Sequence, residues 1–224
     1  VIAEPITGEG GFITPPPEYF PKLIKICRDN GILFISDEIQ TGMGRTGTMF
    51  AMEHWNVEPD LLTVAKSLAA GMPLSAVVGK KEMMEAVHPF GLGGTYGGNP
   101  VACRAGLAVM EIFEEENLLH ASEALGKKLK KRFDAFQNKY ELIGDVRGMG
   151  PMLALELVKD RETKEPAADE AKALVKFCFE KGLIILACGN FGNVIRTLMP
   201  LVITDEQLDR GLTIMEEGLS SLSI

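Results

Sequence analysis

The chain has 224 residues and a formal net charge of -8, with 46% hydrophobic and 24% charged residues. These proportions are ordinary for a soluble globular protein that forms one large domain or two smaller ones. The acidic balance argues against nucleic acid as a partner, because proteins that bind it usually carry clustered lysine and arginine. No apolar run is long enough to cross a bilayer, so no membrane partner is expected.

Short strands alternate with helices over the first part of the chain. The expected strands are 1–3, 32–37, 61–66 and 75–79, and the expected helices are 21–30, 49–55 and 81–87. Strands that alternate with helices imply a parallel, doubly wound sheet. This part is expected to be a portion of a large α/β domain that covers residues 1–110.

A long helical pattern begins at Asn99-Pro100, where asparagine can cap the helix and proline suits its first turn. The pattern restarts at Leu118 and runs to about residue 136. We expect it to lead into a small α+β domain, so that residues 111–224 form a linking helix and a carboxyl-terminal domain. Its expected strands are 152–158, 183–187 and 194–199, and its expected helices are 169–181 and 204–219. Thr204-Asp-Glu-Gln207 reads as a capping box for the last helix.

The four cysteines are Cys27, Cys103, Cys178 and Cys188, and none of them forms a C-x-x-C pair. Scattered cysteines of this kind are typical of reduced thiols in a cytoplasmic protein, and they predict neither a disulfide framework nor a metal site.

Two strands in the first part end in a charge that a protein interior rejects unless it meets a partner. Asp37 closes the run ILFIS, and Lys66 closes the run LLTVA. Ligands of open α/β sheets bind at the carboxyl ends of the strands, so both side chains are expected at one site. Taken alone, Lys66 could be a strand-end lysine that reaches solvent, and Asp37 could be a helix cap or a salt-bridge partner. A lysine in an apolar pocket, however, becomes a nucleophile suited to Schiff-base chemistry.

Two nucleotide motifs are matched only in part. Gly42-Met-Gly44-Arg-Thr-Gly47 fits G-x-G-x-x-G, but a dinucleotide site needs the strand to run into the glycines and a helix to open on them. The apolar run before Asp37-Glu38 resembles a Walker B strand, yet the chain contains no G-x-x-x-x-G-K-[ST]. A nucleotide-binding protein therefore remains an alternative with weak support.

Several separate stretches, in order along the chain, resemble the class III aminotransferases, which depend on pyridoxal 5'-phosphate. They are EPITGEGGF with Glu9, SDEIQTGMGRTG with Asp37 and Gln40, AKSLAAGMPL with Lys66, GGTYGGNP with Thr95, and NVIRTLMPL with Arg196. Within that family the strongest resemblance is to the 4-aminobutyrate aminotransferases. The resemblance implies the fold-type I architecture of pyridoxal-phosphate transferases.

The resemblance also implies roles for these residues. Lys66 would be the Schiff-base lysine that later shuttles the proton, and Asp37 would keep the ring nitrogen of the cofactor protonated. Gln40 would hydrogen-bond the ring hydroxyl, and Ile39 would pack on one ring face. Thr95 would bind the phosphate of the neighbouring subunit, in a homodimer or a dimer of dimers.

Arg196 and Glu9 would handle two different substrates. The guanidinium of Arg196 suits bidentate binding of the α-carboxylate of glutamate. An ω-amino substrate brings no such group, and Glu9 would then pair with Arg196 and swing aside in the other half-reaction. The implied reaction moves an amino group from 4-aminobutyrate or a similar ω-amino acid to 2-oxoglutarate, giving succinate semialdehyde and glutamate. Acetylornithine or ornithine aminotransferase and an amino-acid racemase of the same family remain alternatives.

The chain opens on Val1-Ile-Ala3 without an initiator methionine, and these residues read as the tail of a buried strand. We therefore expect the carboxyl-terminal part of a longer enzyme. The front part would carry the glycine-rich phosphate loop and the aromatic residue that stacks on the ring. On this reading residues 1–224 alone are an inactive fragment that retains only the fold.

Overall fold

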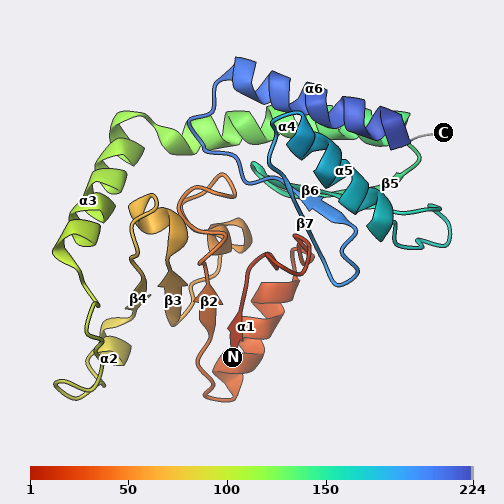
Figure 1. The fold of residues 1–224 in the computed structure, drawn as a ribbon. Helices are drawn as coiled ribbons and strands as arrows, with labels where there is room; N and C mark the ends of the chain where they lie inside the picture. The colour runs from red at the N-terminus through yellow and green to blue at the C-terminus, as the bar shows by residue number, and fades with distance from the viewer. Residues whose placement is uncertain (223–224) are drawn as a thin grey trace. The chain divides into compact units, whose positions relative to one another are not determined.

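The computed structural model describes residues 1–222, which form two compact units. The first unit contains residues 1–6 and 15–120, and the second contains residues 7–14 together with the chain from Ala121 onward (Figure 1). Residues 7–14 therefore pack with a part of the chain that follows more than a hundred residues later. The expected domain division between residues 110 and 111 stays a prediction.

The first unit is built on a four-stranded sheet in the order β1-β2-β3-β4. Its elements are β1 (Ile2–Ala3), α1 (Tyr19–Asp29), β2 (Ile35–Asp37), the 3-10 helix η1 (Ala51–Trp55), β3 (Leu61–Val64), the 3-10 helix η2 (Lys66–Ala69), β4 (Ala76–Gly79), α2 (Lys81–Met84) and α3 (Pro100–Glu115). Helix α1 buries Phe20, Ile24 and Cys27, which lie on one stripe at helical spacing.

The sheet of the first unit is parallel except at one edge. β1 and β2 run parallel, as do β2 and β3, but β4 runs antiparallel to β3. The expectation of a purely parallel sheet is thus wrong for the strand at 76–79. A parallel return needs a crossover of about a dozen residues or more, usually a helix, and the link between β3 and β4 contains only the short helix η2.

The second unit is an antiparallel sheet packed against three helices (Figure 1). Its strand order is β5-β6-β8-β7. The elements are α4 (Leu118–Lys139), β5 (Ile143–Met149), β6 (Met152–Leu157), α5 (Ala168–Glu180), β7 (Leu186–Cys188), β8 (Val194–Arg196) and α6 (Asp205–Leu222). The break before Leu118 and the capping box at α6 are both confirmed. In the capping box, the backbone N–H of Gln207 donates to Thr204 Oγ1, and the backbone N–H of Thr204 donates to Gln207 Oε1.

Alternation along β6 separates a core face from a polar face. Leu153, Leu155 and Leu157 belong to the hydrophobic core of the unit, where side chains from α4, α5 and α6 meet them. Glu156 points the other way, as the period of two of a strand requires. The face away from the helices therefore carries the charged side chains of this sheet.

Strand β5 was not predicted from the sequence. Its residues IGDVRGM contain two glycines and no clear alternation, because only part of one face touches the core. The pairing with β6 makes it a strand. Tertiary pairing thus overrode a weak local pattern.

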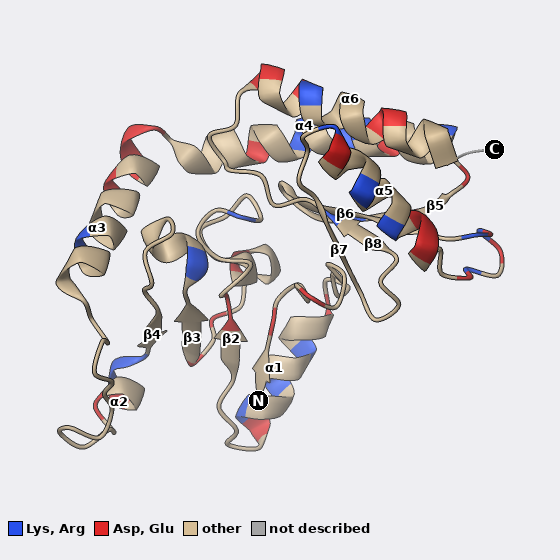
Figure 2. Cartoon of the chain, in the orientation of Figure 1, with Lys and Arg blue, Asp and Glu red and all other residues tan. Residues whose placement is uncertain are grey.

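Charged side chains of both signs are interspersed on α4, α5 and α6 (Figure 2). The basic run at 127–132 is paired rather than open: Lys128 bonds Asp205 at 2.5 Å and Arg132 bonds Glu216 at 3.4 Å. This run is the solvated helix face that its spacing indicates. None of the helices in the described part of the chain is long and apolar enough to cross a membrane.

Candidate functional site

Asp37 and Lys66 follow neighbouring parallel strands of the first unit. Asp37 is the last residue of β2 and lies in register with Thr63 on β3, and Lys66 begins η2 two residues after β3 ends. Carboxyl ends of parallel strands meet at one edge of a sheet, where open α/β folds bind ligands. The structure therefore brings both residues to the same edge. Within residues 1–222 no ion pair joins them.

The carboxylate of Asp37 is held in place by two hydrogen bonds to one oxygen. The Thr63 hydroxyl donates to Asp37 Oδ1 at 3.1 Å, and the Ile39 N–H donates to the same atom at 3.2 Å. Thr63 was not predicted as a site residue. The signal for it was a polar side chain in the otherwise apolar run LLTV, but only the strand register shows which carboxylate it meets.

Lys66 has an unusual backbone conformation, with φ of +49° in the left-handed region. Such a conformation costs about 1–3 kcal/mol for a residue other than glycine, and it persists where the surroundings enforce it. The side chain of Lys66 is exposed. The residues of this chain therefore leave Lys66 exposed, and the apolar pocket expected around it stays a prediction.

Glu38, next to Asp37, organises the glycine-rich loop rather than facing a ligand. Its side chain is buried, with 1% exposed, and accepts bonds from the Thr41 hydroxyl and from the N–H groups of Ala51 and Met52, both at 3.0 Å. A carboxylate engaged by these donors is not placed like the metal-binding acid of a Walker B strand.

The loop that contains Gly42, Gly44 and Gly47 closes on itself. The Gly47 N–H donates to the Gly44 carbonyl at 3.1 Å, and the next helical element, η1, is a five-residue 3-10 helix. A dinucleotide fingerprint requires an α-helix that opens on the glycines. The loop therefore lacks the context of a nucleotide site. Burial lowers the pKa of Arg45 in this loop below its ordinary value.

The other predicted cofactor residues lie in two different settings. Ile39 and Gln40 follow Asp37 by two and three residues and are half-buried, so they lie beside it at the sheet edge. Thr95 is exposed and lies inside a turn in which the Gly97 N–H donates to the Gly94 carbonyl at 3.0 Å. Among the described residues no hydrogen bond joins Thr95 to Asp37 or Lys66.

Glu9 and Arg196 form an ion pair within the second unit. Arg196 Nη1 donates to Glu9 Oε1 at 2.7 Å, and the exposed fractions of the side chains are 10% for Arg196 and 71% for Glu9. The side chain of Arg196 is therefore mostly buried, whereas the side chain of Glu9 is mostly exposed to solvent. Cys188 is a neighbour: burial raises the pKa of its thiol, Glu9 adds to that rise, and Arg196 opposes it.

Arg196 keeps donor capacity beyond this ion pair. In the part of the chain that the structure describes, its buried Nε has no hydrogen-bond partner. A guanidinium binds a carboxylate best through two parallel N–H bonds. Arg196 therefore has one N–H donor that its ion pair with Glu9 does not use. The described residues contain no cluster of histidine, cysteine and acidic side chains that could hold a metal ion.

The residues present fit pyridoxal phosphate in their chemistry. An acid fixed at a strand end, an amine at the end of the next strand and a half-buried amide beside the acid match a protonated ring nitrogen, an aldehyde and a ring hydroxyl. Together with the α/β unit and the antiparallel α+β unit, they define a fold-type I transferase of the pyridoxal-phosphate-dependent class.

The family model for aminotransferase class III matches residues 1–219, and the chain belongs to that family. It is 52% identical over 223 residues to 5-aminovalerate aminotransferase of Pseudomonas putida, a match that covers 100% of this chain and 52% of the relative. It is 49% identical to 4-aminobutyrate aminotransferase of Escherichia coli, covering 97% and 51%, and 49% identical to a leucine/methionine racemase of Thermococcus litoralis, covering 99% and 50%.

Solved structures give the same result. A transaminase from the marine bacterium Virgibacillus aligns with a TM-score of 0.93 at 34% identity, covering 99% of this chain and 52% of that one. The taurine:2-oxoglutarate aminotransferase of Bifidobacterium kashiwanohense, solved with pyridoxal phosphate and glutamate, aligns with a TM-score of 0.92 at 31% identity, covering 99% and 51%. The chain spans about half the length of the relatives it matches.

Proposed function

We propose that the protein to which this chain belongs is a pyridoxal-phosphate-dependent aminotransferase of ω-amino acids. It moves the amino group of 4-aminobutyrate, or of a close homologue such as 5-aminovalerate, to 2-oxoglutarate. The observation that carries this proposal is the placement of Asp37 and Lys66 after adjacent parallel strands, with Thr63 bonded to the acid. The aminotransferase relatives at about 50% identity support the choice of substrate.

Asp37, Gln40, Ile39 and Thr95 would hold the cofactor, which supplies an electron sink for the carbon that loses its proton. Asp37 keeps a negative charge beside the ring nitrogen and so favours the protonated ring. Its bonds from Thr63 and Ile39 orient that charge. Ile39 excludes water from one ring face, and Gln40 orients the ring through its hydroxyl.

Lys66 would serve as the covalent anchor and as the base that moves the proton. Lys66 lies two residues beyond the end of β3, and its left-handed backbone directs the chain into η2. A lysine that alternates between a bound and a free amine must move without rebuilding its strand. Placement just beyond the last ladder bond allows this.

Arg196 would bind the α-carboxylate of glutamate, and Glu9 would cover Arg196 while an ω-amino substrate reacts. The present ion pair is the arrangement expected without an α-carboxylate. Since Glu9 is largely exposed, it can turn away at little cost in packing. In the described residues the Nε of Arg196 is a buried donor without a partner, and a carboxylate that replaced Glu9 could use it as a second bond.

We further propose a cytoplasmic homodimer, or a dimer of such dimers, in which Thr95 serves the neighbouring subunit. Two facts support this: Thr95 is exposed, and large apolar side chains beside it, such as Phe90 and Tyr96, are exposed as well. Exposed aromatic side chains are characteristic of interfaces.

A substrate panel on the full-length protein tests the function. We expect 4-aminobutyrate or 5-aminovalerate to consume 2-oxoglutarate faster than ornithine or N-acetylornithine does, and Lys66→Ala to abolish turnover and covalent retention of the cofactor after borohydride reduction. A racemase is the second candidate because of the leucine/methionine racemase relative. Loss of optical activity from leucine without consumption of 2-oxoglutarate would favour it and contradict the proposal.

A further inference from the structure

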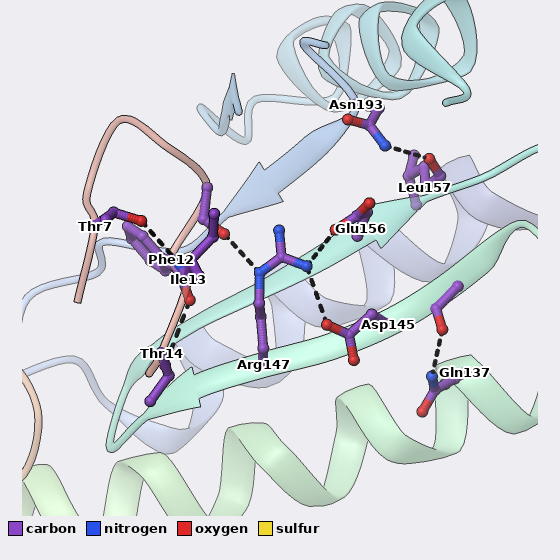
Figure 3. Close-up of polar contacts among 12 residues, drawn as sticks. Thr7, Phe12, Ile13, Thr14, Gln137, Asp145, Arg147, Glu156, Leu157 and Asn193 are labelled. Atoms are coloured by element: carbon purple, nitrogen blue, oxygen red, sulfur yellow. Dashed lines mark hydrogen bonds and ion pairs between the residues drawn. The ribbon is translucent and has the colours of Figure 1, made fainter. Parts of the chain in front are cut away.

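Arg147 lies on the same sheet face as Arg196, with one strand, β6, between them. Arg147 on β5 and Arg196 on β8 are both in register with Ala154 on β6, and residues directly opposite one another in antiparallel strands point to the same face. Two strand spacings put the two arginines about 10 Å apart. This is the face turned away from the helices, and residues 7–14 lie on it (Figure 3).

Arg147 holds the backbone of the segment that carries Glu9. Its Nε donates to the Gly11 carbonyl at 2.7 Å, and its side chain is only 17% exposed (Figure 3). Gly11 has φ of +105°, and a Cβ there would meet Gly189, Val194 and Arg147 at 3.2–3.3 Å. Residues 7–14 therefore pack closely against the sheet at Gly11. A second bond fixes the other side, where the Gly189 N–H donates to the Glu9 carbonyl at 3.0 Å.

The charge of Arg147 is already compensated by side chains other than Glu9. Its Nη1 bonds Asp145 Oδ2 at 3.0 Å and also bonds Glu156, as Figure 3 shows. Two arginines about 10 Å apart could otherwise compete for the one carboxylate of residues 7–14. Because Asp145 and Glu156 neutralise Arg147, Glu9 is left to Arg196.

We propose that Arg147 is a positioning residue for the Glu9–Arg196 pair: it fixes the backbone at Gly11 so that only the side chain of Glu9 moves when substrates alternate. This rests on the proposed function, because the alternation belongs to the two half-reactions. Arg147 itself touches neither substrate nor cofactor. Its effect passes through Gly11 and Glu9.

The test compares Arg147→Gln with Arg161→Gln in the full-length protein. Arg161 is a matched control, since it also donates to backbone carbonyls of this unit, at Ile143 and Tyr140, but not to residues 7–14. Single-turnover rates are measured for 4-aminobutyrate and for glutamate. We expect Arg147→Gln to slow the first reaction about tenfold more than the second. Arg161→Gln should leave the ratio unchanged.

Hydrogen exchange gives a readout that needs no turnover. The amides of residues 7–14 should exchange faster in Arg147→Gln than in the wild type, and at the wild-type rate in Arg161→Gln. Equal exchange in all three proteins overturns the proposal. If Arg147→Gln does not fold, Arg147→Lys is measured in the same way, because it keeps the charge and loses the planar fork.

A Glu9→Gln background separates this inference from the proposed function. We expect Glu9→Gln to shift the rate ratio by itself, and Arg147→Gln to add no further shift to it. A shift with Glu9→Gln but none with Arg147→Gln overturns the positioning role and leaves the function standing. No shift with Glu9→Gln contradicts the proposed role of Glu9, and hydrogen exchange then decides whether Arg147 holds the segment.

Discussion

Asp37 shows how one residue acquires its role from a neighbour on another strand. A carboxylate at a strand end can bind water, cap a helix or pair with a cation. Here Thr63 and the Ile39 N–H fix one oxygen, so the direction of the other is set as well. Orientation of this kind is what a group beside a cofactor ring requires.

Thr63→Val tests this orientation in the full-length protein. Valine keeps the shape of threonine and removes the donor, and a hydrogen bond to a charged group contributes about 1.5–3 kcal/mol. We expect the half-reaction with 4-aminobutyrate to slow by about tenfold or more, with the cofactor still bound, as followed by stopped-flow absorbance. Thr48→Val is the control, because the Thr48 hydroxyl donates to the Phe50 carbonyl instead. Equal rates for the two variants would remove Thr63 from the site.

At the scale of elements, buried polar groups and close backbone contacts decide the local structure. The loop after β2 has little regular structure of its own, and Glu38 supplies the acceptors for its N–H groups. Helix α4 likewise approaches the turn between β5 and β6 at Gly126. A Cβ at this position would clash with the backbone of Gly150.

Glu38→Gln should destabilise the first unit. The amide places a donor against N–H groups that now point at a carboxylate, and an unsatisfied buried group costs about 1–3 kcal/mol. Trp55, the single tryptophan, lies in η1 next to the residues that Glu38 holds, so its fluorescence reports urea unfolding of this region. We expect a lower urea midpoint. Glu58→Gln, at an exposed position, should leave the midpoint unchanged.

Gly126→Ala and Gly211→Ala should have opposite effects on stability. Alanine is favoured over glycine in helices by about 1 kcal/mol. A Cβ at Gly126 in α4 would lie 2.5 Å from the Gly150 carbonyl carbon, whereas a Cβ at Gly211 in α6 would meet its nearest atom at 3.5 Å. Thermal unfolding followed by circular dichroism should show a lower midpoint for the first variant and a higher one for the second. A rise for both would show that α4 can move away from the turn.

For the whole molecule, the described chain leaves much apolar surface open. The large apolar side chains that are at least half exposed in the segment after α2 are Phe90, Leu92, Tyr96, Val101 and Leu107. A patch-free surface is usual for a protein that acts alone. We expect these side chains to be covered by other protein surface.

Residues 1–224 purified alone should therefore associate and should not transaminate 4-aminobutyrate. Static light scattering should give a mass above 24.3 kDa that falls when Phe90 and Leu92 are both replaced by serine. The coupled assay for succinate semialdehyde should show no turnover. A monomer that turns over at the rate of the full-length protein would contradict both expectations.

The sequence by itself determined most elements, and it predicted the site residues named above except Thr63 and Arg147, whose roles stay predictions. Strong local signals carried these predictions: apolar runs that end in a charge, the cap at Asn99, the capping box before α6, and separate stretches resembling one family. Such signals act within a few residues of one another, so they survive without knowledge of the fold.

Only the tertiary structure decided the direction of β4, the existence of β5, the exposure of Lys66 and the partners of Asp37 and Arg147. Each depends on contacts between residues that lie far apart along the chain. Arg147 and Gly11 are separated by 136 positions, and no local pattern encodes which backbone carbonyl a distant guanidinium will meet. That choice is made by strand register, because register sets which side chains share a face.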